Sequence, residues 1–175
     1  MRAALASMLV LALLAPAAAQ GKTKTPAVPF GVQVVEVCER FASGDKRALD
    51  DAGQSGWDAE GQDSDTPFVE VFAGSRTLQG FGIGQLFAFV ETYPNTLLGY
   101  CRVEVPTPTG DGAQQIAAIE GLDRYAGTSQ TTGEGIFASL ASTESSAETM
   151  LLTHWTDESF VVQMTTITPQ PVAAN

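Results

Sequence analysis

The sequence predicts an α+β fold, a two-layer sandwich in which two main helices pack on one face of an antiparallel sheet of about six strands. Apolar residues recur at helical spacing in two stretches, 31–44 and 111–127. Short alternating apolar runs, separated by turn residues, follow each stretch. The predicted order is therefore α-βββ-α-βββ, which is typical of α+β sandwiches. The similar order of the two halves indicates a duplicated α-βββ unit, although no repeat of individual residues supports it.

The first nineteen residues have the pattern of a cleavable signal peptide. Arg2 precedes an apolar run from Ala3 to Ala15, and Ala17-Ala18-Ala19 matches a signal peptidase site. The run is shorter than the roughly 20 apolar residues that span a bilayer, and no later segment is long and apolar enough to do so. We therefore expect cleavage after Ala19 and a periplasmic or extracellular protein. The predicted organisation is a flexible leader (20–30), a single domain (31–169) and a C-terminal tail (170–175).

The first half begins with a helix whose apolar stripe is formed by Val34, Val35, Cys38 and Phe41. Gly44 can end this helix, and a second short helix is expected between Asp45 and Gly53. A polar loop (53–67), a strand (67–74), a glycine-rich bend (75–84) and a hairpin (85–106) follow. Because the hairpin's first strand is apolar on both faces, it is expected near the centre of the sheet.

The second half begins with a helix over 111–127, for which Asp111 is a candidate N-cap and Gly127 a candidate C-terminal residue. A threonine-rich loop follows. Three strands are then predicted over 135–142, 148–155 and 160–167, joined by turns rich in serine, threonine and acidic residues.

The chain has two cysteines, Cys38 and Cys101, and an export signal, which together favour one disulfide. Cys38 lies on the apolar stripe of the first helix. In the hairpin, Cys101 lies on the strand face where a helix would pack. We therefore expect a bond that joins the helix to the sheet. Two buried free thiols, or a bond to another chain, are the alternatives.

The balance of charge limits the classes of partner. The net charge is −11 at pH 7, and loss of Arg2 with the signal peptide makes it more negative. Such a surface repels phosphate backbones, so nucleic acid is not expected as a partner. No cofactor motif is present, and no cofactor is expected. The acidic loop holds four candidate calcium ligands, Asp58, Glu60, Asp63 and Asp65, but their spacing does not fit an EF-hand, and a solvated loop is the default interpretation.

His154 is the single histidine, so any mechanism that needs two histidines is excluded. It lies close in sequence to Asp157, Glu158 and Ser159. A general acid or base acting near neutral pH would most naturally be this residue. The alternative is a partly buried histidine beside a solvated acidic turn.

These features favour an exported, non-catalytic binding or accessory module of the cell envelope, with a protein partner or a small apolar ligand. The alternative is an exported hydrolase using His154 with Asp157 or Glu158. Six aromatic residues are most simply placed in the core, although a subset could line a pocket: Trp57, Phe68, Phe72, Phe87, Phe89 and Phe160.

Overall fold

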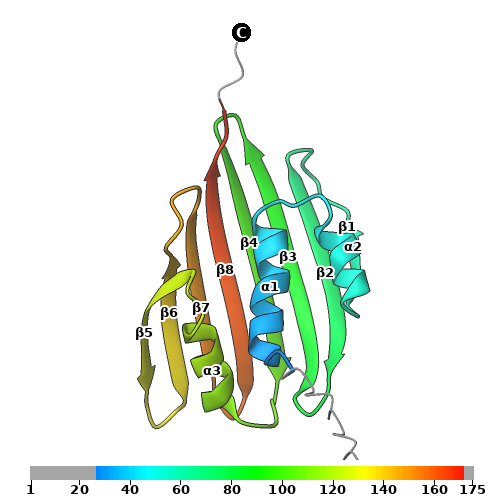
Figure 1. Ribbon diagram of the computed structural model, residues 1–175. Coiled ribbons are helices and arrows are strands. Elements are labelled where there is room, and N and C mark those ends of the chain that lie inside the picture. The colour runs from blue at the N-terminus through cyan, green and yellow to red at the C-terminus, as the bar shows by residue number, and fades with distance from the viewer. Residues whose placement is uncertain (1–26, 172–175) are drawn as a thin grey trace, which may run out of the picture.

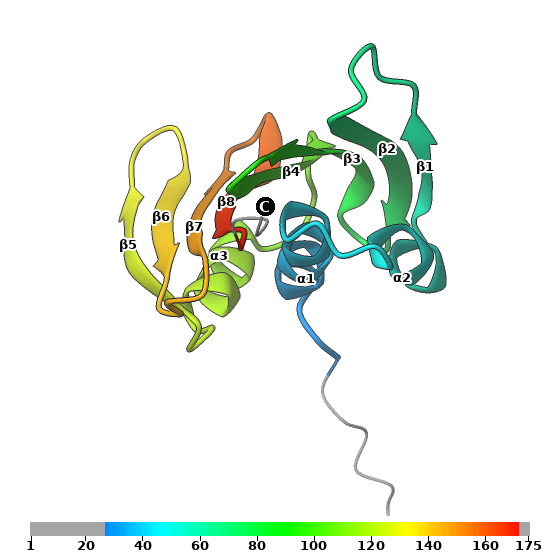
Figure 2. The ribbon, with the colours of Figure 1, turned by 90° about the horizontal axis from the view of Figure 1, so that it is seen from above.

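The computed structural model describes residues 27–171, in which eight antiparallel strands form one sheet and three helices lie on one of its faces (Figures 1 and 2). The predicted signal peptide, residues 20–26 of the leader and residues 172–175 of the tail lie outside the described residues. No helix in the described part of the chain is long and apolar enough to cross a membrane.

The elements follow one another as two helices, four strands, one helix and four strands. Their bounds are α1 (Phe30–Ala42), α2 (Ala48–Gln54), β1 (Asp58–Gln62), β2 (Val69–Leu78), β3 (Gly82–Tyr93), β4 (Thr96–Pro106), α3 (Gly112–Glu120), β5 (Tyr125–Thr131), β6 (Ile136–Ser142), β7 (Glu148–Trp155) and β8 (Ser159–Pro169).

The sheet is built from two four-stranded meanders that meet at its centre. The strand order is β1-β2-β3-β4-β8-β7-β6-β5, and every neighbouring pair is antiparallel. Each meander runs inward from an edge strand, and the last strand of the first meander, β4, pairs with the last strand of the second, β8. The two halves thus share one order of elements, except that the first has the additional helix α2.

The predicted fold class is wrong in its counts, because residues 27–171 form eight strands in one sheet rather than six, and three helices rather than two main ones. The missed strands are the two edges of the sheet. β1 lies within the predicted polar loop (53–67), and all but one of its five residues are exposed. In β5, Tyr125 is buried and the next six residues are exposed. Both strands are held by backbone pairing with one neighbour, which leaves little apolar alternation in their sequences.

The helix predicted over 111–127 is shorter in the structure. Asp111 is its N-cap, and its side chain accepts a hydrogen bond from the Gln114 backbone N–H at 3.1 Å, as expected. However, α3 ends at Glu120, and Gly127 lies within β5 instead of ending the helix. Tyr125 extended the apparent helical spacing, but it is buried as the first residue of β5.

The core lies between α1 and the middle of the sheet. The predicted apolar stripe of α1 is fully buried, and Cys101, Val103 and Val105 of β4 are buried beneath it. Cys38 and Cys101 form the expected disulfide, with their Cα atoms 5.2 Å apart. This bond joins positions 63 residues apart in the sequence.

Gly99 allows α1 to lie directly against β4. It is buried, and a Cβ atom added there would lie 1.8 Å from the Ala42 carbonyl oxygen at the end of α1. The contact is with backbone, which cannot rotate away as a side chain can. Only glycine therefore fits beneath the C-terminal end of α1.

We predict that Gly99→Ala lowers the free energy of unfolding by about 3 kcal/mol or more, because α1 must move away from the sheet to accept the methyl group. Gly61→Ala is the matched control: Gly61 also lies in a strand, and nothing lies within 4 Å of the added Cβ. Urea denaturation measures both. Equal stability of the two variants would contradict this account of the α1–β4 contact.

Candidate functional site

Among the described residues, no helix covers the face of the sheet opposite α1, α2 and α3 (Figure 2). Viewed from above, the sheet arches over the three helices, so this outer face is convex (Figure 2). Successive side chains of a strand point to opposite faces, and directly paired residues share a face. The strand register therefore assigns each residue to the helix side or to the outer face.

One row of paired residues crosses the outer face through all eight strands without a carboxylate, a histidine or a basic side chain. We call it the neutral row. Its members, from β1 to β5, are Gln62, Val71, Phe89, Tyr100, Thr165, Met150, Ala141 and Ala126. At a strand spacing of about 4.8 Å, the row is roughly 30 Å long. In a chain with a net charge of −11, such a continuous row is a distinct surface.

Apolar side chains on either side widen the neutral row. Phe87 is 45% exposed, and its ring lies 6.3 Å from those of Phe89 and Tyr100. The Phe89 and Tyr100 rings are stacked at 5.1 Å. On the β7 side, Met150 is 55% exposed, and other exposed apolar residues of this face are Leu152, Phe137 and Ile167. Monomeric proteins rarely expose a large contiguous apolar surface without a partner.

Two aromatic residues expected in the core are exposed. Trp57 and Phe160 are buried as expected, but Phe68 is 66% exposed and Phe87 points outward. β3 is apolar on both faces, and its helix side, with Leu86, packs into the core. The sequence thus indicated that the strand is interior to the sheet, but it could not show that one of its faces is left uncovered.

His154 also lies on the outer face, together with Met150 and Leu152 as the strand alternation predicts. Its Nε2 lies 3.2 Å from the hydroxyl oxygen of Ser159, and its ring lies 5.7 Å from that of Phe137. His154, Phe137 and Leu152 line a shallow hollow of about 410 Å³, to which β5 contributes Thr128 and Gln130.

The two carboxylates proposed to act with His154 lie in the exposed turn between β7 and β8. The backbone N–H of Glu158 donates to the Thr156 hydroxyl, and Asp157 precedes it in the turn. Within residues 27–171, neither side chain is hydrogen-bonded to His154. The acidic group whose charge affects the pKa of His154 is instead Glu104, which is paired with Arg102 at 2.7 Å.

Burial lowers the pKa of His154 from its ordinary value of 6.5. The positive charge of Arg102 lowers this pKa further, and Glu104 opposes both effects. The imidazole is therefore mostly neutral at pH 7, where its Nε2 accepts a hydrogen bond from the Ser159 hydroxyl in one tautomer and donates one to it in the other.

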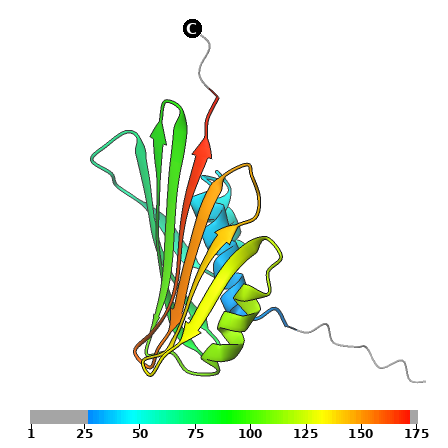
Figure 3. The same ribbon diagram turned by 90° about the vertical axis from the view of Figure 1, so that its left-hand side faces the viewer.

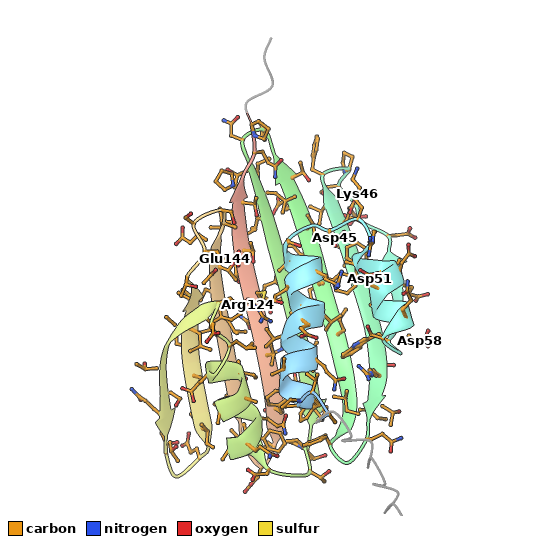
Figure 4. The ribbon with its side chains drawn as sticks, viewed as in Figure 1. Asp45, Lys46, Asp51, Asp58, Arg124 and Glu144 are labelled. Atoms are coloured by element: carbon orange, nitrogen blue, oxygen red, sulfur yellow. A yellow bond between two sulfur atoms is a disulfide. The ribbon has the colours of Figure 1, made fainter. Side chains whose placement is uncertain are left out.

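A second, larger hollow of about 890 Å³ lies on the helix side. Its lining extends from α2 over α1 to the inner face of β7 and β8. Three of its lining residues, Asp51, Arg124 and Glu144, are labelled in Figure 4. Immediately before β5, Arg124 binds Glu39 of α1 through two hydrogen bonds of 2.5 and 3.1 Å. The hydroxyl of Tyr125, the first residue of β5, donates to the same carboxylate at 2.9 Å. Burial and the charge of Glu39 raise the pKa of Tyr125. At the other end, Asp51 of α2 pairs with Arg40.

The four candidate calcium ligands lie at and after β1. Asp58 and Glu60 share the outer side of this edge strand, and Asp63 and Asp65 lie in the loop that follows it. Among the residues that the structure describes, no three or more histidine, cysteine or acidic side chains are placed so that they could hold a metal ion.

The neutral row and the Glu39–Arg124–Tyr125 cluster were not anticipated from the sequence. The row depends on the register between eight strands, two of which carry almost no apolar signal. The cluster joins residues about 85 positions apart. The local sequence signal of an outward apolar surface is β3, which carries apolar residues on both faces, with Leu86 buried and Phe87 exposed.

We predict that Arg102→Gln raises the pKa of His154, because it removes a nearby cation and leaves Glu104 free to stabilise the imidazolium. NMR titration of the single histidine measures this, and in the unsubstituted protein the pKa should lie below 6.5. Since folding favours the neutral form, the contribution of His154 to stability should fall as the pH drops through 6.5 toward the folded-state value. His154→Gln should remove this pH dependence. A pKa at or above 6.5 in the folded protein would contradict the prediction.

The chain was compared with protein-family models, curated proteins and solved structures. None of the three comparisons gave a match. Its function is therefore inferred from its own residues and geometry.

Proposed function

We propose that this chain is an exported, non-catalytic binding protein of the cell envelope that docks a protein partner on the outer face of its sheet. The observation that carries the proposal is the neutral row, which crosses all eight strands with exposed apolar side chains on it and beside it. Large exposed apolar surfaces with polar rims mark protein-binding sites.

The residues of this surface suit the centre of a protein interface. Phe87, Phe89 and Tyr100 form a cluster of aromatic side chains, and Met150 adds a flexible apolar one. Aromatic residues and methionine are enriched at the centres of interfaces, where charged residues are depleted. The aromatic cluster lies on β3 and β4, whose other faces are fixed in the core, so this part of the surface is held rigidly.

The charges around the neutral row indicate the chemistry of the partner. Glu91 and Glu148 lie on the outer face beyond one side of the row, and Glu60 lies near its β1 end. The partner that fits is a protein with an apolar surface, curved to match a convex sheet, and a basic rim. The overall charge of −11 would also speed its association with such a partner.

The helix-side hollow suits an apolar ligand less well than the outer face suits a protein. Its lining includes Glu39, Asp51, Arg124 and Glu144, together with threonine and serine hydroxyls. The arginines are largely paired with acidic side chains, so a ligand there would have to be polar. The proposal therefore favours a protein over a small apolar molecule.

Hydrolysis is the second candidate function, and it rests on the contact between Ser159 and His154. In this scheme the Ser159 hydroxyl is the nucleophile and His154 the general base. The 3.2 Å distance and the neutral imidazole support it. Asp157 and Glu158, which the sequence suggested as partners of His154, make no hydrogen bond to it in the described structure. The dyad therefore lacks a group that orients its base, which is why we place this function second.

We predict that Met150→Glu weakens binding of the partner at least tenfold, because it buries a carboxylate at the centre of an apolar interface. The exported protein, immobilised through its C-terminus, would be exposed to envelope extract, and the captured proteins identified by mass spectrometry. Affinity for each captured protein would then be measured for the unsubstituted and substituted chains.

Phe68→Glu is the matched control, since it places the same charge at an exposed aromatic position outside the neutral row. A partner should bind this variant as it binds the unsubstituted protein, and circular dichroism should show that both variants are folded. The proposal fails if every captured protein binds Met150→Glu as well as it binds the control.

For hydrolysis, we predict that a fluorophosphonate probe, which forms a covalent bond with activated serine hydroxyls, leaves Ser159 unmodified at pH 7.5. The hydroxyl has a base but no third group that holds the base in position. Intact-mass measurement, with Ser159→Ala as the control, tests this. Labelling that is lost in Ser159→Ala would favour the hydrolase over the binding protein.

A further inference from the structure

The two edges of the sheet differ in the features that control pairing with another chain. β1 is one edge and β5 the other, and in the described residues each pairs with a single strand. Seen from its own side, β5 runs along the border of the sheet with no other described element beyond it (Figure 3). An uncovered edge presents unpaired N–H and C=O groups that can pair with a further strand.

The β1 edge is protected by charge, whereas the β5 edge is not. Asp58 and Glu60 lie in β1, and Asp63 and Asp65 follow it. Acidic side chains at an edge repel a second copy of the same strand. The seven residues of β5, Tyr125–Thr131, include no charged side chain and no proline. In a chain with 20 acidic residues, the longer of the two edges is therefore the uncharged one.

The register identifies the backbone groups that face outward from β5. Backbone hydrogen bonds join Thr143 N–H to Arg124 C=O and Thr132 N–H to Gly135 C=O at the two ends of the β5–β6 pair. Because hydrogen-bonded and non-hydrogen-bonded pairs alternate in an antiparallel ladder, the even-numbered residues of β5 bond to β6. The N–H groups of Gly127, Ser129 and Thr131 therefore point away from the sheet, while that of Tyr125 donates to Leu122.

These outward groups are symmetric about Ser129. We propose that two copies of this chain associate through β5, paired antiparallel with Ser129 opposite its counterpart. Ser129 would exchange two hydrogen bonds with Ser129 of the second copy, and each of the two Gly127–Thr131 pairs would add two more. Such pairing is a closed two-fold arrangement that uses both β5 edges and leaves only the charged β1 edges at the ends of the joined sheet.

The dimer gives the outer faces a common orientation. A two-fold axis perpendicular to the sheet relates strands that pair antiparallel, so the helices of both copies lie on one side and the outer faces on the other. Thr128 and Gln130, which line the hollow beside His154, would then lie next to the same hollow in the second copy. This inference rests on the β5 edge and does not depend on the proposed function.

Analytical ultracentrifugation of the exported protein, with its own N-terminal segment, tests the proposal. Assembly is measured at concentrations from about 1 to about 500 µM, a range that suits the weak affinity expected of an interface made by one pair of strands. The unsubstituted protein should be a dimer that dissociates within this range. Ser129→Pro removes an outward N–H without breaking the β5–β6 ladder and should raise the dissociation constant about tenfold or more. Ser129→Ala keeps the N–H and should dimerise like the unsubstituted protein.

Two charged variants at the same position provide a second test in case Ser129→Pro does not fold. Ser129→Glu and Ser129→Lys each place like charges opposite one another across the two-fold axis, so each alone should be monomeric. An equimolar mixture of the two should recover the dimer, with one chain of each kind. The proposal is overturned if the unsubstituted protein is monomeric throughout the range. It is equally overturned if Ser129→Glu alone dimerises as well as the unsubstituted protein, because the contact would then lie on another surface.

Discussion

The contact between α1 and β4 is the constraint on which the rest of the structure depends. The Cys38–Cys101 bond joins the buried stripe of the helix to the strand, and Gly99 lets the end of the helix lie directly on the sheet. In the chain-entropy model, closing a loop of this length stabilises the folded state by about 4 kcal/mol. β4 is also the strand through which the first half pairs with β8 of the second. Fixing α1 on β4 therefore fixes the helix layer over the junction of the two halves.

The same strand holds in place the outward residues of the proposed docking surface. β4 directs Gly99, Cys101 and Val103 into the core and Tyr100 outward, so packing on the helix side holds the outward residues in place. The cost of an uncovered apolar face is poor solubility, and a net charge of −11 distributed over the rest of the chain offsets it. A catalytic interpretation of this face has a weaker structural basis, because His154 contacts Ser159 while the nearby carboxylate of Glu104 is paired with Arg102.

The parts of the fold that could be predicted from the sequence are those where burial imposes a period. The apolar stripe of α1, the alternation in β4, the Asp111 cap and the cysteine pair are all local patterns, and the structure confirms them. β1 and β5 could not be predicted, because backbone pairing holds them in the sheet and few of their side chains are buried, so their sequences carry little apolar alternation. The candidate site was missed for a related reason. Tyr100, Thr165 and Met150 become neighbours only through cross-strand register, and register cannot be read from one strand alone.

The two halves of the chain share one arrangement of elements but differ in what covers them. In the first half, α2 packs on β1, and acidic residues line that edge of the sheet. In the second half, α3 passes directly into β5, whose edge is uncharged, and the polar hollow opens over the inner face of β7 and β8. Acidic side chains protect the β1 edge against pairing with a further strand, whereas the uncharged β5 edge has no such protection. In the proposed arrangement, the first half contributes most of the aromatic docking surface, and the second half provides the edge at which a second copy would extend the sheet.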